Sequence, residues 1–527
     1  YKLPGAEEEP EQPTGVADGD YVIWAPAYNK ALSTSYNGFY NLGTDVTKTD
    51  GKLSGYTDAD IWTVGVNEDG TFTIMQLTDL HYNNESERSW PIPEQVQNLV
   101  KAENPDLVIL TGDIVTSGDP AEGWKAIGDM MAKAGVPYAV TIGNHDPEIT
   151  SREFIFDYLE TQPLFVGEKG PEHLKGMGTY ALEILASDGS DKARSIIYCM
   201  DSNDYHIGYE TNRPYAWIEW DKIAWYRNLS RSYTEANGGK PLPSLAFFHI
   251  PTFEYKLMEH QPGVYGVALE GYGHGSSDIN SGLLSSFLDM GDVTGVFTGH
   301  DHDNDFIGKI NGIALAHGRF GGYDTYGTPE RGCRIVRLHE GSRKFDSWNS
   351  TQNGPESIYC YPAGMTDVEY DAMAAKKALN VNPQKNGINY TYYEDFKGSS
   401  TEEFGKSGKE IRKGVMSTFS ISDAAGKDAF AYDFKAYLRI DDTYIYDFRL
   451  TSDDGAVLYI DGEKIADNDG SHSASSVETR IKLEKGFHEI CLKYFDDCEG
   501  ERLEVLMSGP DFSRTPVPAE LLYTIEN

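Results

Sequence analysis

Thr141-Ile142-Gly143-Asn144-His145-Asp146 directly follows an apolar run at residues 136–140. Such a run predicts a buried strand, and α/β enzymes carry their functional side chains where these strands end. By itself, a Gly-Asn-His-Asp sequence is equally compatible with an ordinary turn. Its meaning therefore depends on whether other strands end in the same way.

Four further segments place histidine or aspartate after an apolar run. They are Asp79-Leu80-His81, Gly112-Asp113, His249 and Gly299-His300-Asp301-His302, and the runs are residues 73–77, 107–110, 245–248 and 293–297. Only 13 histidines occur in the 527 residues, and five of them fall in the five segments. We therefore predict that five strand ends meet at one edge of one sheet and form a functional site.

Helical patterns alternate with these strands, which predicts an α/β sandwich over residues 67–348. The expected helices cover residues 93–103, 123–134, 220–235 and 281–290. A glycine-rich passage, residues 262–277, separates the His249 strand from the next helix. Long loops inside compact domains are usually functional, so we expect this one at the rim of the site.

The residue types in the five segments suit a pair of divalent metal ions. Carboxylate and imidazole donors bind borderline divalent metals, and two ions about 3.5–4 Å apart share a bridging carboxylate. Asp113 suits this bridge. Asp79 and His81, like His300 and His302, are two residues apart and so project to the same side of extended backbone.

In their order and spacing, the five segments resemble the signature blocks of the calcineurin-like metallophosphoesterases. Finer features resemble the purple-acid-phosphatase-like subgroup of that family. These features are Phe247-Phe248-His249-Ile250-Pro251, Asn280-Ser281-Gly282-Leu283, Gly299-His300-Asp301-His302-Asp303-Asn304-Asp305-Phe306 and Gly318-Arg319-Phe320-Gly321-Gly322-Tyr323.

The resemblance implies a cofactor of two divalent metal ions, drawn from Mn, Fe and Zn. It assigns them to two overlapping ligand sets, Asp79, His81, Asp113 and His302 for one ion and Asp113, Asn144, His249 and His300 for the other. True purple acid phosphatases have a metal-binding tyrosine three residues after the bridging aspartate. That position is Thr116 here, so we expect no tyrosinate-coordinated iron.

The resemblance also implies the catalytic roles. His145 is expected to stay free of metal, to bind the phosphoryl group and to protonate the leaving oxygen, with Asp146 orienting its ring or raising its pKa. Asn144, Arg319 and Tyr323 are expected to bind substrate together with His145.

Regions outside residues 67–348 have a different composition. Residues 1–18 read as a flexible acidic tether, and residues 19–66 as a β-rich segment with β-prone runs at 21–24, 31–33 and 61–64. Residues 349–386 are polar and turn-rich, which predicts a linker with a short helix at 366–379. Alternating strands then predict an all-β sandwich over residues 387–527.

This last sandwich resembles the protective-antigen-type (PA-fourteen) module, in segments such as Leu450-Thr451-Ser452-Asp453-Asp454-Gly455 and Asp467-Asn468-Asp469-Gly470. Modules of that family often bind glycans, sometimes through calcium. The resemblance therefore implies a polysaccharide partner and a calcium ion, although turn geometry alone explains Asp453, Asp454 and Asp469 and is the favoured interpretation of them. The predicted fold class is α/β, a metallophosphoesterase β-sandwich flanked by helices, with a small N-terminal β-rich segment and a C-terminal all-β sandwich.

Composition limits the partners and the location. The net charge of −38 opposes binding to nucleic-acid polymers, and no run of 18 apolar residues predicts a membrane span. The sequence begins at Tyr1 rather than methionine, so we expect that a signal peptide has been removed and that the protein is secreted or held at a bacterial surface by a lipid anchor. Cys491 and Cys498 are compatible with a disulfide or with two thiols.

Three functions are compatible with these observations. The leading one is a secreted phosphatase that hydrolyses phosphomonoesters of small molecules or glycans by in-line attack of a metal-bridging hydroxide, with His145 as general acid. A phosphodiesterase or cyclic-nucleotide hydrolase would use the same site. The third, a glycan-binding adhesin with an inactive catalytic domain, is disfavoured because all seven metal ligands are present.

Overall fold

This computed structural model describes residues 65–498 and 500–525, together with the backbone of five short strands that precede them. Those strands are β1 (Trp24–Ala25), β2 (Lys30–Thr34), β3 (Tyr40–Gly43), β4 (Thr47–Thr49) and β5 (Lys52–Ser54). They pair antiparallel as a three-stranded sheet, β1-β2-β3, and a two-stranded sheet, β4-β5. The predicted β-rich character of this segment is therefore confirmed, whereas the tether at 1–18 and the strand predicted at 61–64 lie outside the described residues.

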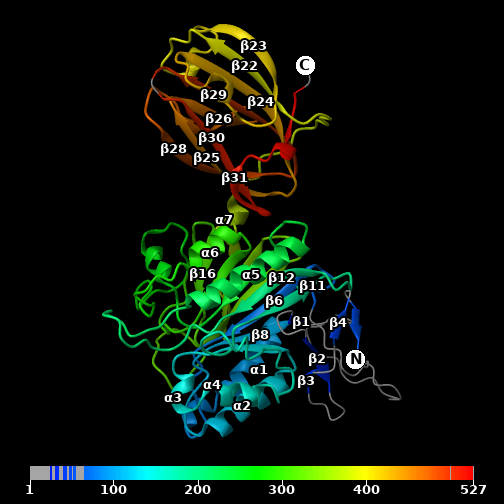
Figure 1. Cartoon of the computed structure of the whole chain (residues 1–527), viewed down its shortest axis with the longest axis vertical. Helices are drawn as coiled ribbons and strands as arrows, with labels where there is room; N and C mark the ends of the chain where they lie inside the picture. Colours follow the sequence, from blue (N-terminus) through cyan, green and yellow to red (C-terminus); the bar gives the residue numbers. More distant parts are fainter. Residues whose placement is uncertain are drawn as a thin grey trace. The chain divides into compact units, whose positions relative to one another are not determined.

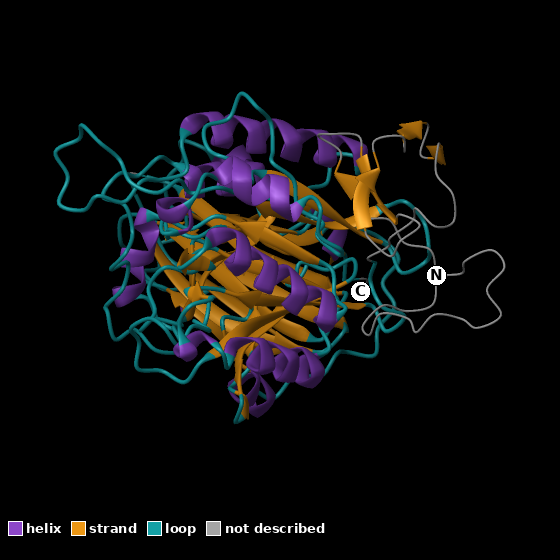
Figure 2. Cartoon of the chain, turned by 90° about the horizontal axis from the view of Figure 1, so that it is seen from below, coloured by secondary structure: helices purple, strands orange, loops and turns teal. Residues whose placement is uncertain are grey.

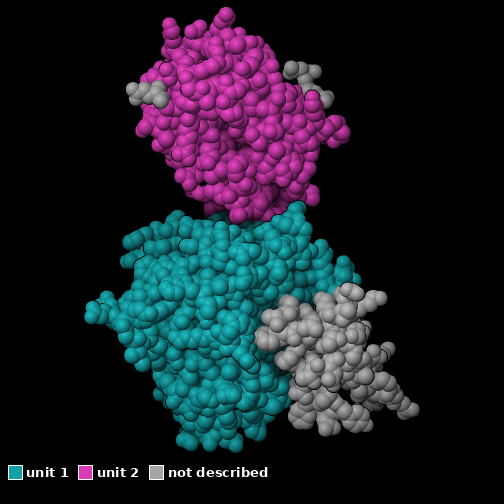
Figure 3. All heavy atoms as spheres, viewed as in Figure 1, with its two compact units in different colours: residues 1–367 teal, residues 368–527 magenta. Residues whose placement is uncertain are grey.

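The chain divides into two compact units, Tyr1–Asp367 and Val368–Asn527, which Figure 3 colours separately. Unit 1 contains two sheets. The first has the order β10-β8-β6-β17-β18-β20-β21, with β19 paired to β18, and the second has the order β11-β12-β13-β14-β16-β15. A small parallel pair, β7 (Tyr82–Asn83) and β9 (Val115–Ser117), stands beside them.

The first sheet combines parallel and antiparallel strands. β6, β8 and β10 are parallel, and β17 joins β6 antiparallel. The bounds are β6 (Thr71–Leu77), β8 (Leu107–Thr111), β10 (Tyr138–Thr141), β17 (Gly332–His339), β18 (Phe345–Thr351), β19 (Gly354–Pro355), β20 (Tyr359–Tyr361) and β21 (Met365–Thr366).

In the second sheet, β12, β13, β14 and β16 are parallel. The outer strands β11 and β15 are antiparallel to their neighbours. The bounds are β11 (Tyr180–Leu185), β12 (Ala193–Cys199), β13 (Ser244–Phe247), β14 (Val293–Thr298), β15 (Ile307–Ile310) and β16 (Ile313–His317).

Helices lie on both sides of the strands (Figure 2). The α-helices of unit 1 are α1 (Ile92–Glu103), α2 (Pro120–Ala134), α3 (Asp146–Ile149), α4 (Arg152–Leu159), α5 (Trp220–Ala236) and α6 (Leu283–Met290), and the 3-10 helices are η3 (Glu87–Ser89) and η4 (Phe253–His260). The four helices predicted from the sequence are thus confirmed. α2 begins three residues earlier than predicted because the Asp119 carboxylate caps the backbone N–H groups of Ala121 and Glu122.

Two apolar layers hold unit 1 together. Between the sheets, residues such as Ile74 and Ile109 of the first belong to one cluster with Leu245 and Phe297 of the second. A separate cluster lies between the second sheet and helices α5 and α6, where the Tyr226 and Phe287 rings meet edge to face at 4.8 Å. Strands buried on both faces explain the continuous apolar runs of the sequence.

The linker predicted at 349–386 is wrong over its first part. Residues up to Thr366 complete the first sheet through the end of β18 and through β19, β20 and β21. Their polar side chains are satisfied inside the protein, since Ser350 Oγ donates to Glu103 Oε1 at 2.5 Å. The helix predicted at 366–379 is also shorter, because α7 (Asp367–Ala372) ends before Lys376 and Leu379 pair with Leu483 and Phe487 of unit 2.

Unit 2 is an all-β sandwich, as predicted, and its two sheets have the orders β23-β22-β24-β29-β26-β27, with β32 paired to β24, and β28-β25-β30-β31. The Cys491 thiol donates to Glu489 Oε1, so it is not bridged to Cys498. The bounds are β22 (Ile388–Glu394), β23 (Lys409–Met416), β24 (Phe430–Ile440), β25 (Tyr444–Asp453), β26 (Ala456–Ile460), β27 (Glu463–Asn468), β28 (Ser475–Leu483), β29 (Gly486–Asp496), β30 (Arg502–Gly509), β31 (Phe512–Pro516) and β32 (Leu522–Tyr523).

Among the described residues of the whole chain, no helix has the length and apolarity that a membrane span requires.

Candidate metal centre

The predicted ligands lie at the ends of parallel strands from both sheets. Figure 1 labels β6 and β8 of the first sheet and β12 and β16 of the second. The first sheet supplies Asp79 and His81 after β6, Asp113 after β8 and Asn144 after β10. The second supplies His249 after β13, and His300 and His302 after β14. The prediction of one sheet edge is therefore wrong in detail, because facing edges of two sheets deliver the side chains.

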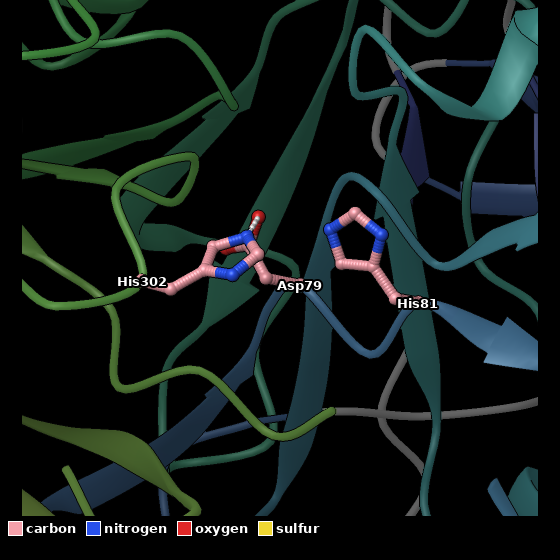
Figure 4. Close-up of side chains that lie close together, drawn as sticks. All are labelled: Asp79, His81 and His302. Atoms are coloured by element: carbon pink, nitrogen blue, oxygen red, sulfur yellow. Dashed lines mark ion pairs between the residues drawn. The ribbon is translucent and has the colours of Figure 1, made fainter. Parts of the chain in front are cut away.

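Asp79, His81 and His302 form the first ligand group, with one ligand atom from each within 4.8 Å of the others. Asp79 Oδ1 lies 3.3 Å from His302 Nε2, and Figure 4 shows these two side chains pointing toward each other with His81 beside them. His302 Nδ1 lies 3.1 Å from the Tyr326 carbonyl oxygen and donates to it, so Nε2 is the nitrogen that faces Asp79. In the neutral ring this Nε2 offers a lone pair to a cation placed between it and the carboxylate.

Two buried atoms of this group support the same conclusion. Asp79 Oδ1 and His81 Nε2 have no hydrogen-bond partner. Buried polar atoms are normally satisfied, so orphans that converge on one point indicate a ligand site. The other nitrogen of His81 lies 3.1 Å from Thr116 Oγ1, which fixes the ring from the position that carries the metal-binding tyrosine of true purple acid phosphatases.

Asp113, His249 and His300 form the second group, and their ligand atoms also lie within 4.8 Å of one another. His249 Nδ1 lies 2.8 Å from the Thr111 carbonyl oxygen, so Nε2 faces the site. Around this Nε2 lie Asp113 Oδ2 and Asn144 Oδ1, each at 3.1 Å, and His300 Nδ1 at 3.2 Å. Four electron-pair donors at this spacing fit a divalent cation.

Asp113 faces both groups. Its Oδ2 lies 3.1 Å from His249 Nε2 and 3.7 Å from His81 Nε2. Gly143 makes this placement possible, since a Cβ there would lie 2.2 Å from Asp113 Oδ1. The backbone at Asp113 has a φ of 52°, in the left-handed region that non-glycine residues rarely adopt. The donor set and its shared carboxylate therefore fit two metal ions.

The protonation states agree with this donor set. Burial lowers the pKa of His81 to about 4, so its ring is neutral and able to bind a metal at neutral pH. Without metal, burial opposes ionisation of Asp113, but a protonated His249 holds the pKa of Asp113 below its usual range, and a metal ion bound to His249 Nε2 would take the place of that proton. Within the described residues, no lysine or arginine side chain bonds to any of the seven predicted ligands, so neutralisation of the carboxylates falls to the histidines or to bound cations.

His145 lies beside the two groups, with its ring centroid 5.6 Å from that of His81 and its side chain 39% exposed. Its backbone N–H donates to Asp113 Oδ1 at 2.8 Å, and its Nδ1 lies 2.9 Å from Glu148 Oε2. Glu148 therefore orients the ring, which leaves Nε2 to meet a substrate.

Asp146 does not have the predicted role. Its carboxylate accepts backbone N–H bonds of 2.7–3.0 Å from Asp113, Ile114, Val115 and Gly143. It thereby ties the loop after β8 to the loop after β10. Burial and the nearby Asp113 carboxylate raise the pKa of Asp146 to about 6 despite these bonds.

Arg319 and Tyr323, which the sequence predicts to bind substrate, contact other parts of unit 1. Arg319 is buried, forms an ion pair with Asp305 at 2.5 Å and donates to the Glu330 carbonyl oxygen. Tyr323 packs against the core, 5.6 Å from the Arg331 guanidinium. In the described part of the chain, no hydrogen bond joins either side chain to a ligand residue, so substrate binding by Arg319 and Tyr323 stays a prediction.

Three tyrosines of the site were not predicted from the sequence. Asn144 Nδ2 donates to Tyr205 Oη at 2.9 Å, and this hydroxyl donates to Glu148 Oε1 at 3.0 Å. Tyr215 packs edge-on against His300 at 4.4 Å, and Tyr326 stacks on His302 at 4.0 Å. Nothing in their spacing distinguishes them from the other tyrosines of this tyrosine-rich sequence.

Comparisons with known proteins follow the same division of the chain. Residues 72–304 match the family model described as calcineurin-like phosphoesterase, and residues 384–511 match the model described as PA14 domain. "Probable inactive purple acid phosphatase 29" of Arabidopsis thaliana is 30% identical over 318 residues, which cover 54% of this chain and 81% of that protein.

Two further similarities concern phosphatases. "Phosphatase DCR2" of Saccharomyces cerevisiae is 28% identical over 329 residues, which cover 55% of this chain and 56% of that protein. The crystal structure of a dimetal phosphatase from Danio rerio covers 53% of this chain and 95% of that chain, with 13% identity and a TM-score of 0.37.

Proposed function

This chain belongs to the calcineurin-like phosphoesterase family and carries a PA14 domain, and we propose that it is an active phosphatase that hydrolyses phosphomonoesters with two divalent metal ions. The observation that carries the proposal is the position of Asp113 Oδ2, which faces one histidine of each ligand group. A related plant protein is named inactive, but here both ligand groups are complete.

The seven ligand residues would hold the two ions, Asp79, His81 and His302 on one side, His249, His300 and Asn144 on the other, and Asp113 between them. When bound, such ions act as Lewis acids toward the phosphoryl oxygens and make water a stronger nucleophile near neutral pH. The protein contributes a buried donor set that is already in place before substrate arrives.

His145 holds the proton that the leaving oxygen requires. With Nδ1 fixed by Glu148, Nε2 is the atom that would donate to this oxygen as the P–O bond breaks. Asn144 connects the second ligand group to the same region through Tyr205. The chain therefore positions an acid next to the ligand groups, as in-line displacement of an alcohol requires.

The test is a hydrolysis screen of phosphomonoesters and phosphodiesters after the purified protein is loaded with Mn, Fe or Zn. We expect release of inorganic phosphate from monoesters and slower cleavage of diesters. The inverse preference would replace the monoesterase by a phosphodiesterase. A protein that binds both metals and cleaves neither class would favour an inactive, glycan-binding scaffold.

For unit 2 we propose a polysaccharide ligand and a calcium ion, as its PA14 match suggests. Asp454 and Asp469 already accept backbone N–H bonds, from His472 and Thr401 respectively. Asp496 differs, because both of its carboxylate oxygens are buried without a hydrogen-bond partner. Calcium-dependent retention on cell-wall polysaccharide tests this proposal. Export to the cell surface remains a proposal, which fractionation of cells expressing the native gene would test.

A further inference from the structure

Residues 203–217, here called the tyrosine arm, connect β12 to α5 beside the metal centre. The arm folds back on itself, since Tyr205 and Tyr215 form an antiparallel bridge and His206 N–H donates to the Pro214 carbonyl oxygen at 2.9 Å. Its base is anchored by the buried Lys222, whose Nζ lies 2.9 Å from Asn203 Oδ1. In Figure 1 the connection between β12 and α5 projects from the body of unit 1 at the left.

Two tyrosines of the arm contact the second ligand group. The Tyr205 hydroxyl accepts from Asn144 Nδ2 at 2.9 Å, and the Tyr215 ring packs against His300 at 4.4 Å. The two tyrosine rings stack on each other with centroids 6.2 Å apart and an interplanar angle of 28°. The arm thus places a pair of aromatic rings directly beside two metal ligands.

The same pair lies where a leaving group would emerge. The leaving oxygen must approach His145, and His145 and Tyr205 share the Glu148 carboxylate at 2.9 and 3.0 Å. The Tyr205 side chain is 37% exposed, so part of it remains open to a ligand.

The charge of this region favours a neutral leaving group. Glu148 adds a carboxylate next to Tyr205, and among the described residues no lysine or arginine side chain bonds to Glu148, Tyr205 or a ligand residue. The nearby Arg152 is paired with Asp201 and Asp204, and Arg213 of the arm donates to the Gly273 carbonyl oxygen. A negatively charged group on the leaving alcohol would therefore be repelled by the Glu148 carboxylate. A neutral aromatic group would instead stack on the exposed ring, which is favourable beyond the burial of its surface.

We propose that the tyrosine arm forms a subsite for the leaving group and that Tyr205 makes the enzyme selective for phosphomonoesters of aromatic alcohols. The proposal rests on the proposed function and adds its substrate class. Tyr205 acts here through its ring, as a specificity-determining residue, while the metal ligands and His145 act on every phosphomonoester.

Steady-state kinetics of the metal-loaded full chain test the proposal with 1-naphthyl phosphate and glycerol 2-phosphate. Tyr205→Phe keeps the ring and removes the hydroxyl that bonds to Asn144, so it is the reference for the effect of the ring. Relative to Tyr205→Phe, we expect Tyr205→Ala to raise KM for the naphthyl ester about tenfold and KM for the glycerol ester less than about twofold. Ile207→Ser is the matched control, since Ile207 is on the same arm but 96% exposed, and it should leave both KM values unchanged.

Calorimetric binding of naphthyl phosphonate and methyl phosphonate separates this proposal from the proposed function, because phosphonates are not hydrolysed. Tyr205→Ala should weaken the naphthyl compound selectively while metal content stays at the wild-type level. Equal losses for both phosphonates and both esters, or an unchanged naphthyl affinity, would overturn the subsite. Selective loss of naphthyl phosphonate in a protein that hydrolyses no ester would instead retain the subsite and overturn the proposed function.

Discussion

At the residue scale, the Asp113 carboxylate is the side chain on which both ligand groups depend. Asp113→Asn replaces a coordinating oxygen by an NH2 group, which has no lone pair for a metal. We expect bound metal to fall well below the wild-type content and turnover of an aryl phosphate to be lost, as measured by elemental analysis and phosphate release. Asp106→Asn is the control, because Asp106 is a buried aspartate at the opposite end of β8, and it should retain both metals. Full metal content in Asp113→Asn would contradict the bridging role.

His145 and Glu148 form a second, separable pair. His145→Ala should retain both metals and lose about 10²–10⁴-fold in rate on alkyl phosphates, where the leaving oxygen needs a proton. Glu148→Gln should lose less, since glutamine still accepts a hydrogen bond from the His145 ring. Both losses should shrink on esters whose alcohol is acidic. Equal losses on alkyl and aryl esters would show that His145 acts on the phosphoryl oxygens instead.

The metal ligands could be predicted from the sequence because aspartate, asparagine and histidine at strand ends are typical metal-binding residues. Aspartate, asparagine and histidine at strand ends converge, because strand polarity alone brings them together. The residue that orients the His145 ring could not be predicted from its nearness in the sequence. Asp146 follows His145 directly but turns back to the loop after β8, whereas Glu148 reaches the ring because it stands three residues on, on the same face of a helical turn.

At the element scale, the strands and helices of unit 1 could be predicted because each has a strong local signal. Buried parallel strands are continuous apolar runs, and α2 follows an Asp-Pro start and ends at Gly135 with a φ of 70°. Residues 349–366 could not be predicted as strands, because their polar side chains are satisfied by distant residues such as Glu103 and not by solvent. The composition of a segment shows that its side chains are polar, but it does not show which distant residues form hydrogen bonds with them.

β29 carries a buried carboxylate that makes a prediction about pH. Burial, followed by the nearby Asp454 charge, raises the pKa of Asp496 to about 7. The folded state therefore retains a proton that the unfolded chain releases near pH 4, so the stability of unit 2 should fall as pH rises from about 4 through 7. We expect calorimetry to show a decreasing unfolding temperature for unit 2 over this range and a flatter profile in Asp496→Asn.

Calcium provides the control for this prediction. If Asp496 is a calcium ligand, the ion should raise the unfolding temperature of unit 2 at pH 8 in the wild type but not in Asp496→Asn. An identical pH profile in the two proteins would contradict the assigned pKa. Equal stabilisation of both by calcium would place the ion away from Asp496.

In the whole molecule, the last metal ligand precedes the last strands of the catalytic unit in the sequence. All seven ligands precede residue 303, and the match to the phosphoesterase family ends at residue 304. The first sheet nevertheless needs residues beyond that point, since β17 lies between β6 and β18. The chain after residue 304 is therefore part of the catalytic unit, although it contributes no metal ligand.

Two truncations test this view of the catalytic unit. A fragment that ends at Asp367 retains β15 to β21, so we expect it to fold, bind both metals and hydrolyse a small phosphate ester with kcat within about tenfold of the full chain. A fragment that ends at residue 304 loses β17 and exposes an edge of β6 whose residues are almost all buried, so it should be insoluble or unfolded by circular dichroism. Activity in the shorter fragment would show that β17 is dispensable. If the 1–367 fragment binds both metals but is inactive, its metal centre is intact and only binding of the ester is missing. That result would show that residues 368–527 are needed for substrate binding.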